Sequence, residues 1–223
     1  MDCIDVYYSP KQVSCPDSSS PSLSKPALVV ADWVAQGLPI RIVEPAPASR
    51  AQIALAHAPA YVDGILNCEL MNGFRGRQKD VADSLPWTCG SLLSAARGAL
   101  NNGLVACSPT SGFHHAGVES GYGYCTFNGL MVAALALKAE GKVRRVGILD
   151  CDQHYGDGTA EIMAALQSAF LWRGTWPEDI RSQCPACWKS TATPWRRALR
   201  NTLPDQRGFT FDPGICGDLF SLN

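Results

Sequence analysis

The segment GILDCDQHYGDGT, residues 147–159, decides the fold of this chain. It opens with an apolar run that predicts a buried strand over 145–151. Two glycines, Gly156 and Gly158, then allow the chain to turn sharply into a helix predicted from Thr159. A buried strand that leads through a turn into a helix is the repeating unit of α/β proteins, whose sites lie at the carboxyl ends of the strands.

The regions on either side of this segment repeat the alternation. Hydrophobic periodicity and cap residues predict strands at 5–8, 40–43 and 104–107, and helices at 28–36, 49–57, 59–66, 88–100, 128–140 and 159–168. A Ser/Pro-rich loop is expected over 9–26. We therefore predict an α/β fold with a mainly parallel sheet.

Composition limits the classes of protein to which the chain can belong. It has 223 residues, of which 46% are apolar and 17% charged, with a formal net charge of −1. These values exclude a disordered chain, a membrane span and a nucleic-acid surface that works by neutralising phosphates. The start, Met1-Asp2-Cys3-Ile4-Asp5, lacks the cations of a signal peptide. We expect an intracellular, cytoplasmic protein; its oligomeric state stays open.

The character of the sequence changes near residue 168. From there to residue 223 there is no valine, prolines recur, and four of the six tryptophans are found. Because buried parallel strands are rich in valine and isoleucine, we expect a partial domain over 1–167 and a divergent tail over 168–223 that adds no strand to the sheet. Most of the ten cysteines lie in apolar runs and are expected to be reduced and buried. The exception, the single CxxC of Cys184 and Cys187, lacks the further ligands of a zinc site, although a tail-borne binding module stays open.

Three polar residues follow the decisive strand at alternate positions: Asp150, Asp152 and His154. Alternate side chains of a strand share one face, so two carboxylates and an imidazole are predicted to emerge together. Such a group suits a divalent transition metal, and zinc accepts both ligand types. The alternative is that the two aspartates cap the following turn and that the histidine packs in the loop.

Two adjacent histidines occur in the motif SGFHHAG, residues 111–117. On a loop, either His114 or His115 can act as general base towards a water while its neighbour delivers the proton as general acid. Each imidazole needs a carboxylate to fix its tautomer, and Asp150 and Asp157 are the candidates. The alternative is that the pair lies on a solvated loop.

Together these motifs resemble the histone deacetylase superfamily, which has the arginase fold and includes acetylpolyamine amidohydrolases. The resemblance rests on the tandem histidines, GYCTFN (123–128) and DCDQHYGDGT (150–159), with LAHAPAYVD (55–63) and NGF (72–74) upstream. It extends from about residue 5 to residue 167. It implies a three-layer α/β fold of the arginase/deacetylase type, with a mainly parallel sheet that is incomplete on its C-terminal side.

The resemblance also implies a metal site and a substrate channel. Asp152 and His154 would be two of three zinc ligands, and Gly123 and Tyr124 would line the tube that admits the acylated amine. Backbone oxygens of Asp150, Asp152 and His154 would contribute to a structural potassium site.

The reaction that the resemblance implies is hydrolysis of an N-acetyl amide of lysine or of a polyamine. His114 and His115 would be the proton-transfer pair, with Asp150 and Asp157 as their respective orienting carboxylates. Zinc would polarise the carbonyl and lower the pKa of the attacking water.

The sequence departs from the family pattern in several places. Tyr155 stands where a second histidine is common, and the basic, histidine-containing stretch expected near 20–26 is absent. The third zinc ligand has no clear match, since 212–219 is similar only faintly, and no tyrosine follows Tyr155 to polarise the carbonyl. We therefore expect a truncated, weakly active or inactive deacetylase whose residues after 167 are unrelated to the family. The alternative is a non-catalytic fragment or interaction protein.

Overall fold

The computed structural model describes residues 3–14, 20–166, 171–175 and 219–222. Its strands are β1 (Ile4–Tyr7), β2 (Ile40–Val43), β3 (Ala106–Cys107), β4 (Val146–Asp150), β5 (Leu171–Thr175) and β6 (Leu219–Leu222). Its helices are η1 (Pro10–Gln12), α1 (Lys25–Ala35), α2 (Arg50–Ile53), α3 (Pro59–Leu66), α4 (Lys79–Asn102), α5 (Gly129–Ala139) and α6 (Asp157–Ala165). Strands and helices are interleaved along the chain, as the sequence predicts for an α/β protein.

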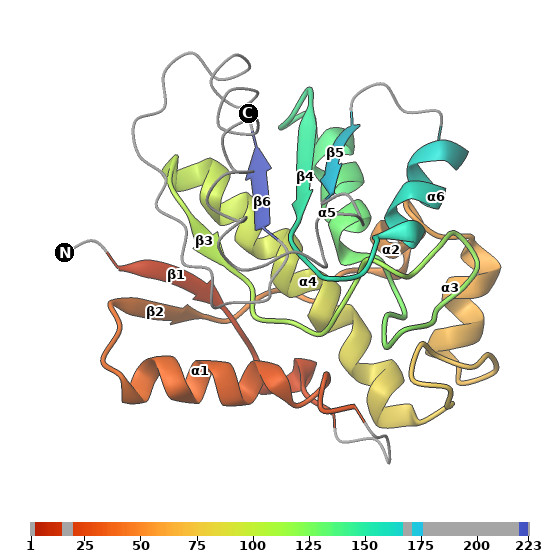
Figure 1. Cartoon of the computed structure of the whole chain (residues 1–223), viewed down its shortest axis with the longest axis horizontal. Helices are drawn as coiled ribbons and strands as arrows, with labels where there is room; N and C mark the ends of the chain where they lie inside the picture. Colours follow the sequence, from red (N-terminus) through yellow and green to blue (C-terminus); the bar gives the residue numbers. More distant parts are fainter. Residues whose placement is uncertain (1–2, 15–19, 167–170, 176–218, 223) are drawn as a thin grey trace.

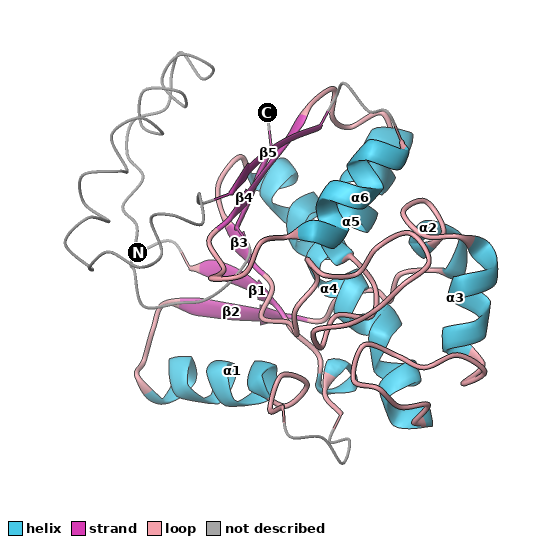
Figure 2. Cartoon of the chain, turned by 45° about the vertical axis from the view of Figure 1, so that its right-hand side comes forward, coloured by secondary structure: helices cyan, strands magenta, loops and turns pink. Residues whose placement is uncertain are grey.

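Backbone hydrogen bonds join the described strands in two groups of three. In the first, β1 lies between β2 and β3, and both pairs are parallel. In the second, β4 lies between β5, which is parallel to it, and β6, which is antiparallel. The strands follow one another as a twisted row that separates α1 from α5 and α6 (Figures 1 and 2). The predicted layered fold with a mainly parallel, partial sheet is confirmed.

One expectation about the tail is wrong. The composition after residue 167 indicated no further strands, yet Leu171–Thr175 and Leu219–Leu222 both pair with β4. Enrichment in valine and isoleucine is typical of central strands that are buried on both faces. The hydrogen bonds between paired strands are made by the backbone, so a strand can form without those residues. The predicted domain boundary at residue 167 stays a prediction, and the CxxC of Cys184 and Cys187 lies outside the described residues.

Helix α4 begins earlier than the sequence indicates. The apolar periodicity predicts a helix only over 88–100, and a proline two residues earlier normally disrupts a helix interior. The structure begins it at Lys79 and keeps Pro86 inside it. Val81 and Leu85 are buried on this first part of the helix, and tertiary packing of this kind overrides local propensity.

Cap residues end or begin the helices as predicted. Ser49 forms a capping box at the start of α2, although that helix ends at Ile53 rather than at residue 57. Gly37, Gly103 and Gly141 follow α1, α4 and α5 with left-handed φ values of 66°, 66° and 69°.

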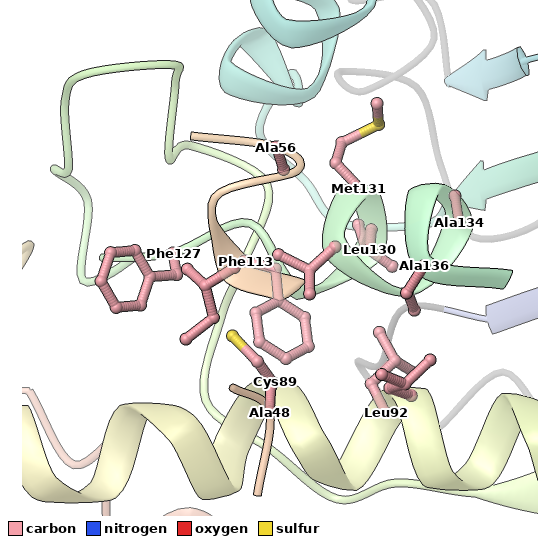
Figure 3. Close-up of a cluster of buried hydrophobic side chains, with 14 of the residues drawn as sticks. Ala48, Ala56, Cys89, Leu92, Phe113, Phe127, Leu130, Met131, Ala134 and Ala136 are labelled. Carbon is pink, nitrogen blue, oxygen red and sulfur yellow. The ribbon is translucent and has the colours of Figure 1, made fainter. Parts of the chain in front are cut away.

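The main core lies between α4 and α5 (Figure 3). Two buried aromatic side chains in it, Phe113 and Phe127, directly precede polar residues of the site. Phe113 is followed by His114, and Phe127 by Asn128, the N-cap of α5. The packing of two phenylalanines therefore sets where two polar loops leave the core.

None of the helices in the described part of the chain is both long enough and apolar enough to cross a membrane. No disulfide joins two cysteines in that part of the chain. Cys89 and Cys125 are buried, as expected, whereas Cys107 and Cys151, also expected to be buried, are only half-buried.

Candidate active site

Two polar segments meet at the carboxyl end of β4. The first is the loop that carries His114 and His115, and the second is the turn of residues 151–156 between β4 and α6. A main-chain hydrogen bond of 3.0 Å from Thr159 N to the carbonyl oxygen of His114 joins them. The two motifs, some 35 residues apart in the sequence, therefore form one centre, as open α/β sheets commonly place their sites.

His114 and Asp150 form the buried pair of this centre. The Nδ1–H of His114 donates to Oδ2 of Asp150 at 2.8 Å, and their side chains are 8% and 2% exposed. Because an ionised carboxylate can only accept, this contact places the proton of a neutral His114 on Nδ1. Its Nε2 is then the nitrogen able to take up a proton, and it lies 3.9 Å from Oδ1 of Asp152.

His115 and Asp157 form a second, more exposed pair. The Nδ1–H of His115 donates to Oδ1 of Asp157 at 2.7 Å, and the carboxylate is 46% exposed. The rings of His114 and His115 lie 4.2 Å apart between centroids. Two adjacent imidazoles, each oriented by its own carboxylate, can pass a proton to and from one bound molecule.

Asp152 and His154 lie together, but not for the reason that the sequence indicated. Strand β4 ends at Asp150, so strand alternation does not align them. Instead, Asp152 N donates to Oδ1 of Asp150 at 2.9 Å, and His154 N donates to Oδ1 of Asp152 at 2.7 Å. The two aspartates therefore cap the turn, as the alternative expected, but the side chain of His154 is 66% exposed and does not pack in the loop. Its Nδ1 lies 3.1 Å from the Asp152 carboxylate.

The electrostatic environment keeps Asp152 ionised. Partial burial opposes its charge, but the main-chain N–H of His154 and the nearby imidazoles of His114 and His154 outweigh that effect and hold the pKa of Asp152 below its usual value. A negatively charged group thus lies beside the His114–His115 pair at neutral pH.

Gly123 and Tyr124, the expected channel residues, both have left-handed backbone, with φ values of 56° and 65°. Gly123 lies against the ring of His115, where a β-carbon would come within 2.6 Å of Cδ2. Tyr124 is exposed, and its ring lies 5.7 Å from that of Phe74. The ring of Tyr122, which no sequence motif indicated, lies 5.0 Å from the ring of His115 between centroids.

Gly156 and Gly158 serve close packing rather than a left-handed turn. Neither has a positive φ. A β-carbon at Gly156 would lie 2.7 Å from Oδ2 of Asp150, and one at Gly158 would lie 2.4 Å from the carbonyl oxygen of Ala116. Both glycines let the turn after β4 approach the histidine loop.

Gly123→Ala is expected to destabilise the protein more than Gly141→Ala. Both substitutions place a β-carbon on left-handed backbone, at a cost of about 1–2 kcal/mol. At Gly141 the added carbon meets open space, whereas at Gly123 it meets the ring of His115, which must move away from Asp157. Denaturant unfolding of both variants checks the prediction, and equal losses of unfolding free energy would contradict it.

Comparison with protein families shows the family to which the chain belongs. The sequence model of the family described as "Histone deacetylase domain" matches residues 24–172, which is well over half of the chain. The chain belongs to the histone deacetylase family. The deacetylase match covers every residue of the centre described above.

Individual relatives and a solved structure are similar to parts of this chain. An uncharacterized protein of Picosynechococcus sp. is 34% identical over 145 residues, which are 60% of this chain and 46% of that protein. An acetylpolyamine amidohydrolase of Burkholderia pseudomallei is 40% identical over 83 residues, 35% of this chain and 23% of that enzyme. The crystal structure of the HDA15 HD domain matches with a TM-score of 0.67 at 19% identity, over 78% of this chain and 54% of that one. This deacetylase-family chain spans less than half the length of the curated relatives it matches.

Deacetylases of this family typically use zinc. A catalytic zinc takes three protein ligands and keeps one position for water. Asp152 and His154 supply two neighbouring donors, but within residues 3–14, 20–166, 171–175 and 219–222 no group of three histidine, cysteine or acidic side chains is placed to hold a metal ion. The described part of the chain therefore does not by itself fit a catalytic zinc.

Proposed function

We propose that this chain carries the proton-transfer centre of a deacetylase that hydrolyses N-acetyl amides of lysine or of a polyamine. The observation that supports this most is the paired arrangement of His114 with Asp150 and of His115 with Asp157, at 2.8 Å and 2.7 Å. Relatives named as an acetylpolyamine amidohydrolase, as histone deacetylases and as polyamine deacetylases support the substrate class.

In this proposal the two imidazoles divide the proton transfers. His114, with its proton held on Nδ1 by the buried Asp150, takes a proton at Nε2 from the attacking water. His115 in its imidazolium form, with its Nδ1–H on Asp157, gives its Nε2 proton to the departing amine nitrogen as the C–N bond breaks. The proton that His114 took from the water then returns the pair to its starting charge. The products are acetate and the free amine. Gly123 and Tyr124 would form a wall for the acyl chain beside His115.

We further propose that the chain given by these 223 residues has much reduced or no deacetylase activity on its own. The described residues give two donors for zinc, and no tyrosine follows Tyr155 in the sequence to polarise the substrate carbonyl. Removal of a single preorganised donor to a developing oxyanion slows enzymes by about 10²–10³-fold. A potassium site at the backbone oxygens of Asp150, Asp152 and His154 stays a prediction of the family resemblance.

The alternative, a non-catalytic interaction protein that keeps part of the deacetylase fold, is favoured by exposed apolar side chains. Leu28 and Val34 on α1 are exposed, as are Leu104 and Val105 before β3. Scattered exposed apolar residues are common, so the exposure gives weaker support than the paired histidines do. Cooperative unfolding of a stable monomer would count against this alternative.

Hydrolysis of an acetyl-lysine peptide and of an N-acetylated diamine tests the proposal. With zinc present, we expect the full chain to turn over either substrate at least about 10²–10³-fold more slowly than the Burkholderia pseudomallei relative assayed beside it. Any residual rate should fall in His114→Gln and His115→Gln. A rate close to that of the relative would contradict the reduced activity, and a residual rate unchanged in both variants would contradict the assigned pair.

A further inference from the structure

His57 is the one histidine that takes part in neither the proposed proton transfers nor the candidate zinc donors. It lies directly before α3 and is 3% exposed. Burial lowers its pKa to about 4, so the ring is neutral at physiological pH. A buried polar ring must have its hydrogen bonds satisfied, and the partners of His57 lead directly to the catalytic loop.

The two ring nitrogens of His57 join two segments distant in sequence. The main-chain N–H of Asn128 donates to Nε2 at 2.8 Å, so Nε2 must be the acceptor. The proton of the neutral ring is then on Nδ1, which donates to the carbonyl oxygen of Gly117 at 2.8 Å. Only this tautomer satisfies both contacts.

Asn128 extends the connection along the same loop. Its Nδ2 donates to the carbonyl oxygen of Ala116 at 3.2 Å and to Oγ1 of Thr159 at 2.9 Å. The main-chain N–H of Thr159 in turn donates to the carbonyl oxygen of His114 at 3.0 Å. Three carbonyls in and after the histidine pair, those of His114, Ala116 and Gly117, are therefore held by donors connected through a single buried network.

The side chain of His57 contributes in two ways, by the packing of its ring and by its two hydrogen bonds. Its ring packs between Tyr61 and Phe127, with centroids 5.8 Å and 5.3 Å away, and a phenyl ring could supply that packing. A phenyl ring cannot accept from Asn128 or donate to Gly117, and it would leave two buried main-chain groups without these partners. A glutamine amide offers one donor and one acceptor and can restore both bonds.

We propose that His57 is a positioning residue for the catalytic pair. Through Gly117 and Asn128 it fixes the main chain that follows His114 and His115, and thereby keeps each imidazole on its carboxylate. That His114 and His115 are catalytic rests on the proposed function. Their positioning by His57 does not depend on it, because it can be observed in the protein without substrate or metal.

Nuclear magnetic resonance of the full chain, ¹⁵N-labelled at histidine, tests the proposal, because the sequence contains only four histidines. We expect His57 to stay neutral, with its proton on Nδ1, from about pH 8 to about pH 5. We also expect low-field Nδ1–H signals from His114 and His115. A protonated His57, or one with the proton on Nε2, would overturn the proposal without any variant.

Variants then separate positioning from general stability. His57→Phe is expected to lose the low-field signals of His114 and His115, and His57→Gln to restore them. Leu137→Ala removes a fully buried side chain near the other end of α5 and is expected to keep them. Retention of the signals in His57→Phe, or their loss in Leu137→Ala as well, would overturn the proposal.

Two further outcomes are separable. If His57→Phe does not fold, loss of the signals in a folded His57→Gln overturns the proposal and their retention supports it. Because these signals are read without substrate, an absence of hydrolysis would contradict the proposed function and leave the positioning result unaffected.

Discussion

Replacing Asp150 by alanine is expected to lower the free energy of unfolding by about 2–6 kcal/mol, because each of two buried donors left without its acceptor costs about 1–3 kcal/mol. The Asp150 carboxylate is almost fully buried and accepts from Nδ1 of His114 and from the main-chain N–H of Asp152. Alanine removes both acceptor oxygens, so the two donors lose their hydrogen bonds in a region where water has little access to replace them. Denaturant unfolding at neutral pH measures the loss.

Asp157→Ala is the matched control for this prediction. Asp157 makes the equivalent contact to His115, but its carboxylate is 46% exposed, so water can replace it. We expect a loss of no more than about 1 kcal/mol, in the range of exposed ion pairs. Equal losses for the two variants would contradict the distinction between a buried pair and an exposed pair.

Zinc is expected to bind this chain only weakly, in the micromolar range or above, because two donors hold the ion less tightly than the three of a catalytic site. Competition with a chromophoric chelator measures the affinity. Asp152→Ala should abolish the binding that remains, since it removes one of the two donors. Asp63→Ala, which removes an exposed carboxylate paired with Arg50, is the matched control and should leave the affinity unchanged.

The tail requires a separate control in this titration. Cys184 and Cys187 lie outside the described residues and contain thiols that zinc favours. A variant with serine at both positions separates their contribution from that of Asp152 and His154. Tight one-to-one binding that persists in the serine variant and disappears in Asp152→Ala would contradict the incomplete site.

The candidate site could be predicted from the sequence because its residues lie in two short motifs. The tandem His114-His115 and the aspartates of 150–159 each specify their local chemistry, and the strand–turn–helix pattern indicates where they meet. The pairing of each histidine with its own carboxylate was implied by family resemblance, and both hydrogen bonds are present. The catalytic roles of these residues stay proposals.

The supporting network could not be predicted in the same way. His57 and Asn128 are 71 residues apart, and nothing local in either sequence indicates that one bonds to the other. The same limit explains the early start of α4, where tertiary burial of Val81 and Leu85 outweighs the local effect of Pro86. The same limit explains why the strands after residue 167 were not predicted. They form by pairing with β4, and the composition of a segment does not show which strand it pairs with.

The central claim is that two adjacent imidazoles are each oriented by a carboxylate at the end of β4. Histidine ¹⁵N spectra of the unmodified chain near neutral pH measure this directly. We predict that neutral His114 and His115 both carry their proton on Nδ1. A proton on Nε2 in either residue would contradict it.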